Sequence, residues 1–284
     1  MTSQDSSDIK LSLEKTHLLE PKQKVLLSTN QRPCVLALDS STQRASIALS
    51  IKGELVFSED CFRQKSHSEW INGVIERAMT SIEGDWTQLD LIALIHGPGS
   101  FTGLRVATNV AKALSFIQKT PLVTFNSLEV LATQALESLR SDPEQIILPV
   151  INAFKNKVFC ALYKAQGEGV DTLSEPQVVD VEFLETWVNQ QRQSLRATFS
   201  EGRTAPRVLV VGDGFHAYQE FFSAKLNHFY FRLEDSLDYP IASTLVQLIN
   251  KKGTDLNPIS WRELNPVYLR ASAAEEARVP IEIG

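Results

Sequence analysis

Two short polar loops carry the residue types that could hold an anion or a nucleotide. The first reads Asp-Ser-Ser-Thr at residues 39–42 and directly follows an apolar run that predicts a buried strand. In α/β folds this edge of a sheet commonly binds ligands, where a carboxylate could hold magnesium through water and hydroxyls could contact phosphate. A polar turn that only ends the strand is the alternative.

The second loop reads Gly-Pro-Gly-Ser-Phe-Thr-Gly at residues 97–103. Glycine and proline predict a tight turn, and Ser100 or Thr102 could cap the following helix. A capped helix N-terminus can also hold an anion, although a cap and turn alone would explain the same residues. With a Gly-Asp-Gly turn at 212–214, these loops give the predicted nucleotide or anion site: Asp39, Ser41, Thr42, Gly97, Gly99, Ser100, Thr102, Gly212 and Gly214.

The residue types that bind metals or act as nucleophiles are scattered. The five histidines include no pair four residues apart and no His-Glu-x-x-His string, and the three cysteines include no Cys-x-x-Cys. There is no Gly-x-Ser-x-Gly elbow and no Walker lysine motif. We therefore expect no intrinsic metal. We interpret His67 as a helix cap or surface residue, and His96 as the partner in a local hydrogen bond.

The order of the expected elements predicts the fold. Apolar runs and period-two alternation mark strands, and apolar positions at steps of three and four mark helices. We expect strands at residues 34–39, 45–50, 54–57, 89–95, 121–125, 146–151, 157–163 and 208–211. We expect helices at 69–82, 104–116, 126–139 and 242–251, an inserted polar loop at 189–207 and an extended segment at 265–270.

The first half of the chain has a three-stranded meander, a helix, a strand and a helix, and the second half repeats this order less regularly. The repeat predicts an α/β protein with two duplicated ribonuclease-H-like lobes. This is the plan of the actin, sugar-kinase and Hsp70 ATPase (ASKHA) superfamily. We expect a disordered N-terminal extension at 1–32 and a first lobe at 33–140, to which the family resemblance described below assigns partner binding. The second lobe would cover 141–284, with its last segment packing back on the first.

Composition excludes several classes of function. The 284 residues are 43% hydrophobic and 22% charged, as in an ordinary globular protein, and the formal net charge is −6. An acidic surface repels phosphate, so we expect any RNA contact to come mainly from a partner. No apolar run approaches the ~20 residues that span a bilayer, and the widely spaced cysteines indicate a reducing cytoplasm.

Several of these stretches together resemble one family. The string from His96 to Arg105, with Ala-Lys-Ala-Leu at 111–114, resembles the signature of the TsaB (YeaZ) family. Residues 36–42 with 45–48 are similar to its opening hairpin, and Lys-Ser-His at 65–67 fits as well. The Val-Gly-Asp-Gly turn at 211–214 and Pro-Val-Tyr-Leu-Arg at 266–270 are similar to its later motifs. The resemblance spans roughly residues 35–276.

The chain departs from the family pattern in two places. The family often has Asp-Ala-Arg after the first strand of the second lobe, where this chain has Asn152, Ala153 and Phe154. A polar role for those side chains is therefore in doubt. The N-terminal extension also has no counterpart in a typical member.

The resemblance further implies that the metal site of the catalytic paralogue, TsaD, is lost. That paralogue carries Asn-His-Leu-Glu-Gly-His, in which two histidines on one helix face bind iron or zinc. The matching residues here place Ser127 and Leu131 at the two ligand positions. The superfamily's phosphate loop reads Asp-x-Gly-Thr, and Ser41 replaces that glycine here.

What the family implies is a non-catalytic subunit of the machinery that makes N6-threonylcarbamoyladenosine in tRNA. It would bind the TsaD-type subunit, together with a TsaE-type ATPase, or form a homodimer. Iron or zinc would sit in the partner, and ATP or ADP could bind this chain. Two helices would form a four-helix interface through an apolar patch drawn from Trp70, Ile71, Val74, Ile75, Ala78, Leu104, Ala107, Thr108 and Ala111. Each of these side chains could instead serve the chain's own core.

Two other functions remain open from the sequence. One is an ATPase or phosphotransferase of the same superfamily, with Asp39 and the turn at 212–214 as phosphate loops. The other is a metallopeptidase, because the family has been grouped with glycoproteases. ATP turnover by the isolated chain would favour the first, and stoichiometric iron or zinc would favour the second.

Overall fold

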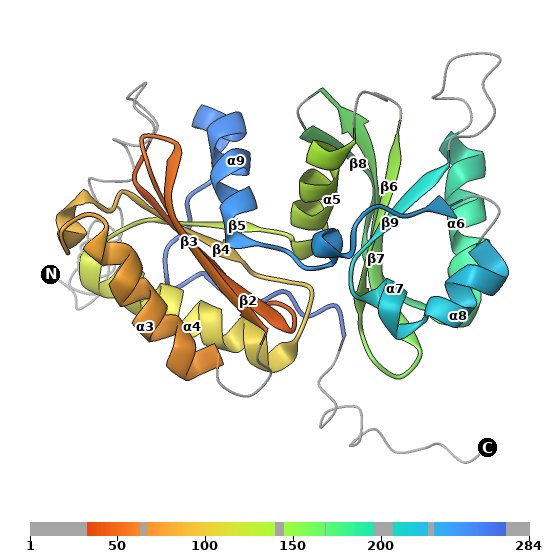
Figure 1. The fold of residues 1–284 in the computed structure, drawn as a ribbon, viewed down its shortest axis with the longest axis horizontal. Coiled ribbons are helices and arrows are strands. Elements are labelled where there is room, and N and C mark those ends of the chain that lie inside the picture. Colours follow the sequence, from red (N-terminus) through yellow and green to blue (C-terminus); the bar gives the residue numbers. More distant parts are fainter. Residues whose placement is uncertain are drawn as a thin grey trace, which may run out of the picture.

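The computed structural model describes residues 33–62, 67–139, 145–167, 169–195, 207–226 and 230–270. The N-terminal extension predicted at residues 1–32 lies outside these ranges. In the described part of the chain there are two five-stranded sheets, each with helices on both of its faces (Figure 1).

The first sheet has the strand order β3-β2-β1-β4-β5. The first three strands form an antiparallel meander, and β4 and β5 add to β1 in parallel. Residues of β1 and β4 are fully buried, as expected for strands that are covered on both faces. The strands are β1 (Val35–Asp39), β2 (Arg44–Ile51), β3 (Glu54–Phe62), β4 (Leu91–Ile95) and β5 (Leu122–Phe125).

The second sheet repeats this plan in the order β10-β9-β6-β7-β8. Again a three-stranded antiparallel meander is followed by two parallel strands. Its strands are β6 (Ile146–Asn152), β7 (Lys157–Gln166), β8 (Gly169–Asp180), β9 (Val208–Val211) and β10 (Tyr230–Phe231). The prediction of an α/β protein with two duplicated, ASKHA-type lobes is confirmed.

The longer helices cover the sheets with apolar faces. On the first sheet, α3 (His67–Thr80) and α4 (Phe101–Gln118) pack on one face and α9 (Ala242–Lys252) packs on the other. On the second sheet, α5 (Ser127–Ser138) covers one face, and α6 (Val181–Leu195) with the short helix α7 (Gly214–Ala217) covers the other. The chain continues from α7 into α8 (Gln219–Phe221).

Two helices pack out of their order in the sequence and join the lobes. The helix α5 precedes the second sheet and packs on it, whereas α9 follows the second sheet and packs on the first. Figure 1 shows both helices between the two sheets. The backbone N–H of Ala242 donates to Ser46 Oγ at 2.8 Å, and Lys252 forms an ion pair with Glu129 at 3.0 Å.

The segment after α9 returns along the first lobe before it reaches the second. Ile259 N donates to Leu122 O at 2.8 Å, and Val267 N donates to His96 O at 2.8 Å. Further on, Arg270 donates from its guanidinium to the carbonyls of Ala153 and Phe154 in the turn between β6 and β7. This segment therefore links the edges of both sheets.

Two regions differ from the sequence predictions. Strand β8 was not predicted, and the first residues of the predicted loop at 189–207 belong to α6, which ends at Leu195. The helix extends there because Val181, Leu184 and Val188 form a buried stripe against the second sheet, and the polar residues that follow occupy its exposed side. Residues 196–206 of the predicted loop lie outside the described ranges.

The two glycine-containing loops of the first lobe contact through their backbones. A Cβ atom at Gly103 would lie 1.9 Å from Ser40 O, and one at Gly99 would lie 2.1 Å from Ser41 O. Glycine is needed at these two positions because there is no space for a side chain.

We expect Gly103→Ala to lower the free energy of unfolding by about 1–3 kcal/mol, because the backbone must move to admit the methyl group. Urea unfolding followed by circular dichroism measures the change. Gly73→Ala in α3 is the matched control, since its Cβ would meet nothing closer than Arg77 Nη1 at 3.6 Å. That substitution should be neutral or stabilising by up to about 1 kcal/mol. Equal effects at both positions would contradict the close contact.

Candidate functional site

The structure brings the first two predicted loops together at the N-terminus of α4. Ser100 N donates to Ser41 O at 2.7 Å, and Ser40 Oγ donates to Gly103 O at 2.7 Å. Ser100 is the N-cap of α4, with its side chain accepting from Gly103 N, so the capping prediction is confirmed for Ser100. Thr102 lies in the first turn and is exposed.

Contact between these loops closes the Asp-Ser-Ser-Thr turn to solvent. Asp39 and Ser41 are fully buried, and Thr42 nearly so. Asp39 Oδ1 accepts from Ser41 N at 2.8 Å, while Asp39 Oδ2 and Ser41 Oγ find no hydrogen-bond partner among the described residues. Burial raises the pKa of Asp39 to about 7, partly offset by the hydrogen bond from Ser41. A carboxyl group so placed is a poor magnesium ligand, because a cation would have to lose its hydration to reach it.

The third predicted loop lies on the second lobe, against β6. Gly212 has φ 108°, and a Cβ there would lie 2.1 Å from Val150 O. A Cβ at Gly214 would meet the same carbonyl at 2.9 Å. Between them, Asp213 Oδ1 accepts from Asn152 N at 2.9 Å, and burial raises the pKa of Asp213 to about 6. This turn therefore serves the packing of β6 and β9.

A group of charged side chains fixes the same turn. Asp238 is fully buried and accepts from Gly212 N at 2.8 Å, from the Arg232 guanidinium and from His216 Nε2 at 2.5 Å. Asp235 also pairs with Arg232, at 3.1 Å. His216, Asp235 and Asp238 lie close enough to share a metal ion, but Arg232 already provides the positive charge between the two carboxylates. We interpret the cluster as structural.

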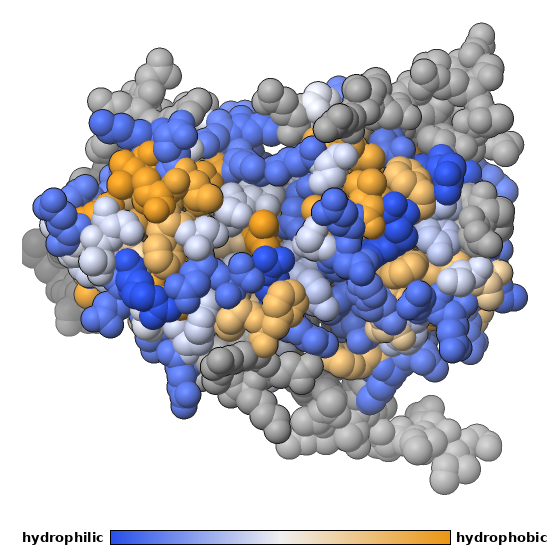
Figure 2. All heavy atoms as spheres, in the orientation of Figure 1, coloured by the Kyte–Doolittle hydropathy of each residue, from blue (hydrophilic) through white to orange (hydrophobic). Residues whose placement is uncertain are grey.

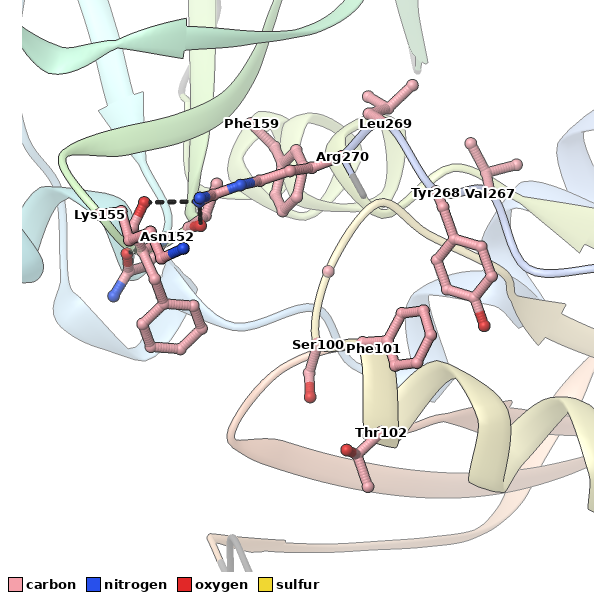
Figure 3. A pocket seen from close by; sticks show the side chains of 13 residues that line it. Ser100, Phe101, Thr102, Asn152, Lys155, Phe159, Val267, Tyr268, Leu269 and Arg270 are labelled. Atoms are coloured by element: carbon pink, nitrogen blue, oxygen red, sulfur yellow. Dashed lines mark hydrogen bonds between the residues drawn. The ribbon is translucent and has the colours of Figure 1, made fainter. Parts of the chain in front are cut away.

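A cleft of about 320 Å³ opens between the lobes. Figure 3 shows Ser100, Phe101 and Thr102 on one side of it, and Asn152, Lys155 and Arg270 on the other. Of the predicted anion site, only Gly99, Ser100 and Thr102 line this cleft. Two segments that line the cleft were not predicted to form a site. The turn between β6 and β7 had been noted only as a departure from the family pattern, and the segment from Val267 to Arg270 only as part of a family motif.

The predicted interface residues lie mostly inside the chain's own core. Trp70 is half-buried, and the other eight are buried, which corrects the expectation that this group forms an apolar patch on the surface. The physical reason is that a helix lying on a sheet needs one apolar stripe for that sheet, and these residues supply it. They are Ile71, Val74, Ile75, Ala78, Leu104, Ala107, Thr108 and Ala111.

A second apolar stripe on α4 runs beside the buried one. Val106 and Val110 are half-buried and pack against the core of the first lobe, whereas Ala113 is exposed and Ile117 is 66% exposed. The steps of four, three and four place all four side chains on one flank of the helix. The opposite flank contacts the returning segment, where Phe116 meets Trp261 edge-on with ring centroids 5.1 Å apart.

Packing residues occupy the two positions at which the sequence resemblance predicts that metal ligands are replaced. Ser127 is buried and donates from Oγ to Pro98 O at 2.6 Å, and Leu131 is buried in the core between α5 and the second sheet. His96 Nδ1 forms a hydrogen bond with Phe125 O at 2.8 Å, which confirms the predicted local bond. The side chain of His67 lies outside the described part of the structure. No helix among the described residues is both long and apolar enough to cross a membrane.

We expect Asp39→Asn to change how stability depends on pH. The folded-state pKa of about 7 lies above the ordinary value of 3.8, so ionisation of Asp39 costs the folded state roughly 4 kcal/mol once the pH exceeds 7. The free energy of unfolding of the native chain should therefore fall as the pH rises from about 4 to about 7. The asparagine variant cannot ionise and keeps the acceptor for Ser41 N, so its loss over this window should be smaller. Urea unfolding at pH 5 and pH 8 measures how the free energy of unfolding of each protein changes with pH. An equal change in the native chain and the asparagine variant would contradict the argument that burial of Asp39 raises its pKa.

Comparison with known proteins adds to this geometry. The family model described as "TsaD: tRNA N6-adenosine threonylcarbamoyltransferase" matches residues 62–278. The tRNA threonylcarbamoyladenosine biosynthesis protein TsaB of Haemophilus influenzae is 26% identical over 245 residues, which cover 84% of this chain and 94% of that protein. A tRNA N6-adenosine threonylcarbamoyltransferase of Thermodesulfovibrio yellowstonii is 33% identical over 132 residues, or 41% of this chain and 39% of that protein.

A solved structure agrees with this likeness in fold. YeaZ from Pseudomonas aeruginosa superposes with a TM-score of 0.66 at 22% identity and covers 84% of this chain and all of its own. The TsaD-family match spans well over half of the chain, and the relatives that match most of its length carry the TsaB name. The chain therefore belongs to the TsaB (YeaZ) family, within the wider group that the TsaD model describes.

Proposed function

We propose that this chain is a non-catalytic subunit in the synthesis of threonylcarbamoyladenosine in tRNA, and that it binds a TsaD-type catalytic subunit through α3 and α4. The observation that carries the proposal is the second apolar stripe of α4, because a helix with one stripe on its own sheet has no need of another at the surface. Family membership supplies the pathway.

The proposed docking surface is the groove between α3 and α4. One flank of α4 is taken by the returning segment, so the flank with Val106, Val110 and Ile117 turns toward α3. On α3, half-buried Trp70 and Gly73 lie one turn apart. Gly73 has no side chain, so a helix of a partner could approach closely there once the Arg77 guanidinium, 3.6 Å from the position of a Cβ at Gly73, moves aside.

The interface would differ from the predicted one in its residues, not in its helices. The buried stripe of each helix holds α3 and α4 on the sheet and fixes their spacing. The exposed stripe then meets the partner, and two helices from each subunit would form a four-helix interface of about 800 Å² on each side. Without the partner, two copies of this chain could pair through the same groove.

The absence of catalysis is proposed from the helix α5. The hydroxyl of Ser127 donates to a carbonyl, and the Leu131 side chain has no donor atom for a metal ion. The alternative of an ATPase receives no support from the turn at residues 39–42, because Asp39 and Ser41 are buried. We assign iron or zinc and most of the tRNA contact to the TsaD-type partner. A TsaE-type ATPase would join the same assembly, which we place in the cytoplasm.

We expect Ile117→Arg to abolish association with the TsaD-type protein from the same genome, or to weaken it by more than tenfold. An arginine within an apolar helix interface would be buried without a partner. The side chain of Ile117 is 66% exposed in the free chain, so the fold should be unaffected. Co-expression followed by size-exclusion chromatography measures association, and circular dichroism checks the fold.

Gln193→Arg is the control for this experiment. Gln193 is exposed on α6, on the far side of the second lobe, and its substitution adds the same charge away from the groove. Full association of the Ile117 variant, or equal loss in both variants, would rule out the groove between α3 and α4 as the docking surface.

The isolated chain should form no threonylcarbamoyladenosine when it is given tRNA and threonylcarbamoyl-AMP. The reason is that no described residue at the α5 positions can bind the metal on which the TsaD-type site depends. Nucleoside analysis of the digested tRNA by mass spectrometry measures product. Addition of the TsaD-type subunit should restore the reaction, and product from this chain alone would overturn the non-catalytic assignment.

A further inference from the structure

The last described stretch of the chain forms part of the wall of the cleft between the lobes. Residues 267–270 all line the cleft, and Arg270 is the last residue that the structure describes. Residues 271–284 follow it in the sequence. This C-terminal segment therefore begins at the wall of the cleft and has only a short distance to cross to enter it.

The wall on the first lobe carries an aromatic pair that is held in place and partly open. The rings of Phe101 and Tyr268 lie 4.6 Å apart, and Arg105 Nε donates to Tyr268 Oη at 3.1 Å. Tyr268 is nevertheless 41% exposed. The pair therefore offers fixed apolar surface to whatever enters the cleft.

The opposite wall presents a phenylalanine on a strained turn. Phe154 is 61% exposed, and Phe154, Lys155 and Asn156 all have left-handed backbones, with φ of 58°, 50° and 59°. Such conformations cost about 1–3 kcal/mol for each non-glycine residue. Arg270 holds the turn by donating to the carbonyls of Ala153 and Phe154 (Figure 3). A segment that covered the Phe154 ring would offset part of the strain by burying apolar surface.

The cleft and the C-terminal segment are opposite in charge. The lining of the cleft includes Lys155 and Arg270 and contains no Asp or Glu. Residues 271–284 include three glutamates and one basic residue; they are Glu275, Glu276, Glu282 and Arg278. The segment is thus drawn to the cleft by its net negative charge.

The end of the segment has an apolar pattern that suits a narrow cleft. Val279, Ile281 and Ile283 alternate with other residues, and alternate side chains of an extended chain point to the same side. Pro280 restricts its own φ and favours an extended conformation in the residue before it. The cleft volume of about 320 Å³ is at the lower end for binding sites, so it fits a short stretch of this kind.

We propose that the C-terminal segment, residues 271–284, folds back and occupies the cleft of its own chain. The apolar side chains of residues 279–283 contact Phe154 and Tyr268, and the glutamates lie near Lys155 and Arg270. A tethered segment acts at an effective concentration in the millimolar range, so weak contacts suffice. The segment is then a built-in cover, and any other occupant of the cleft must displace it.

The N-terminal residues 1–32 are less well placed for this role. They join the first sheet at the start of β1, whereas the loop at residues 97–103 borders the cleft and contacts the chain just after the end of β1. The proposal concerns the isolated chain and needs no TsaD-type subunit, so it can fail while the proposed function holds.

Hydrogen–deuterium exchange of the isolated full chain, read by mass spectrometry, tests the proposal. Backbone amides of residues 279–284 should exchange at least tenfold faster in Phe154→Ala than in the native chain, because the docked segment loses a ring on which it packs. Phe183→Ala on α6 is the matched control, since Phe183 is also largely exposed, at 64%, and does not line the cleft. Circular dichroism checks that both variants fold.

A double substitution in the segment gives a reciprocal test that leaves the described core untouched. Ile281→Ser with Ile283→Ser should speed exchange in the turn at residues 154–156, because the cover is lost. The proposal is wrong if residues 279–284 of the native chain exchange as fast as an unstructured peptide. It is equally wrong if Phe154→Ala and Phe183→Ala act alike, since the segment would then dock elsewhere. Protection that grows with protein concentration would also overturn it, because the occupant would be a second copy.

Discussion

The backbone contact between the two loops of the first lobe governs much of the structure. The carbonyls of Ser40 and Ser41 lie where side chains at Gly103 and Gly99 would be, and Ser100 N completes the contact at 2.7 Å. This contact sets the start of α4 against the end of β1. It also buries Asp39, so the residue best placed by its chemistry to bind a ligand is closed off. The contact fixes the N-terminus of α4 and so helps to set the rotation of the helix about its axis. In this rotation the buried stripe lies on the sheet, and Ala113 and Ile117 of the second stripe are exposed.

The lobes are joined by exchanged elements as well as by chain connections. Helix α9 crosses back to the first sheet and pairs through Lys252 with Glu129 on α5, while the segment up to Arg270 reaches the turn between β6 and β7. The distance between the lobes therefore depends on several independent contacts. The cleft between the lobes is therefore bounded on both sides by segments that these contacts hold.

The sequence alone predicts most of the fold because its signals are local. Buried runs such as Val35–Asp39 and Leu91–Ile95, the cap at Ser100 and the cap at Asn126 all act within a few residues. Strand β8 was missed because its side chains are mostly exposed or half-buried, so it lacks an apolar pattern. The left-handed turn at residues 154–156 contains no glycine, and Asn156 is its only residue of a type enriched in that conformation, so the local signal is weak.

The site was harder to predict because periodicity does not say what covers a stripe. Ala107 and Val110 differ by less than one turn of α4, yet Ala107 is fully buried in the core and Val110 is only half-buried at its margin. A pattern of small and apolar residues is compatible with both. Only the position of the sheet and of Trp261 on the other flank decides between them.

The helix α5 carries structural residues at the two positions that the sequence resemblance matches to metal ligands. Ser127 and Leu131 lie one turn apart and are fully buried, the first fastened to the loop at residues 97–103 through Pro98 and the second packed between sheet and helix. Two imidazoles at these positions would need space that the core does not have, and a metal ion there would have no open coordination position for a substrate. Histidines at these positions would therefore require the packing around α5 to change, so two substitutions alone would not create a metal site. Under the proposed function, in which a partner carries out the chemistry, the same packing leaves the fold of this chain unchanged.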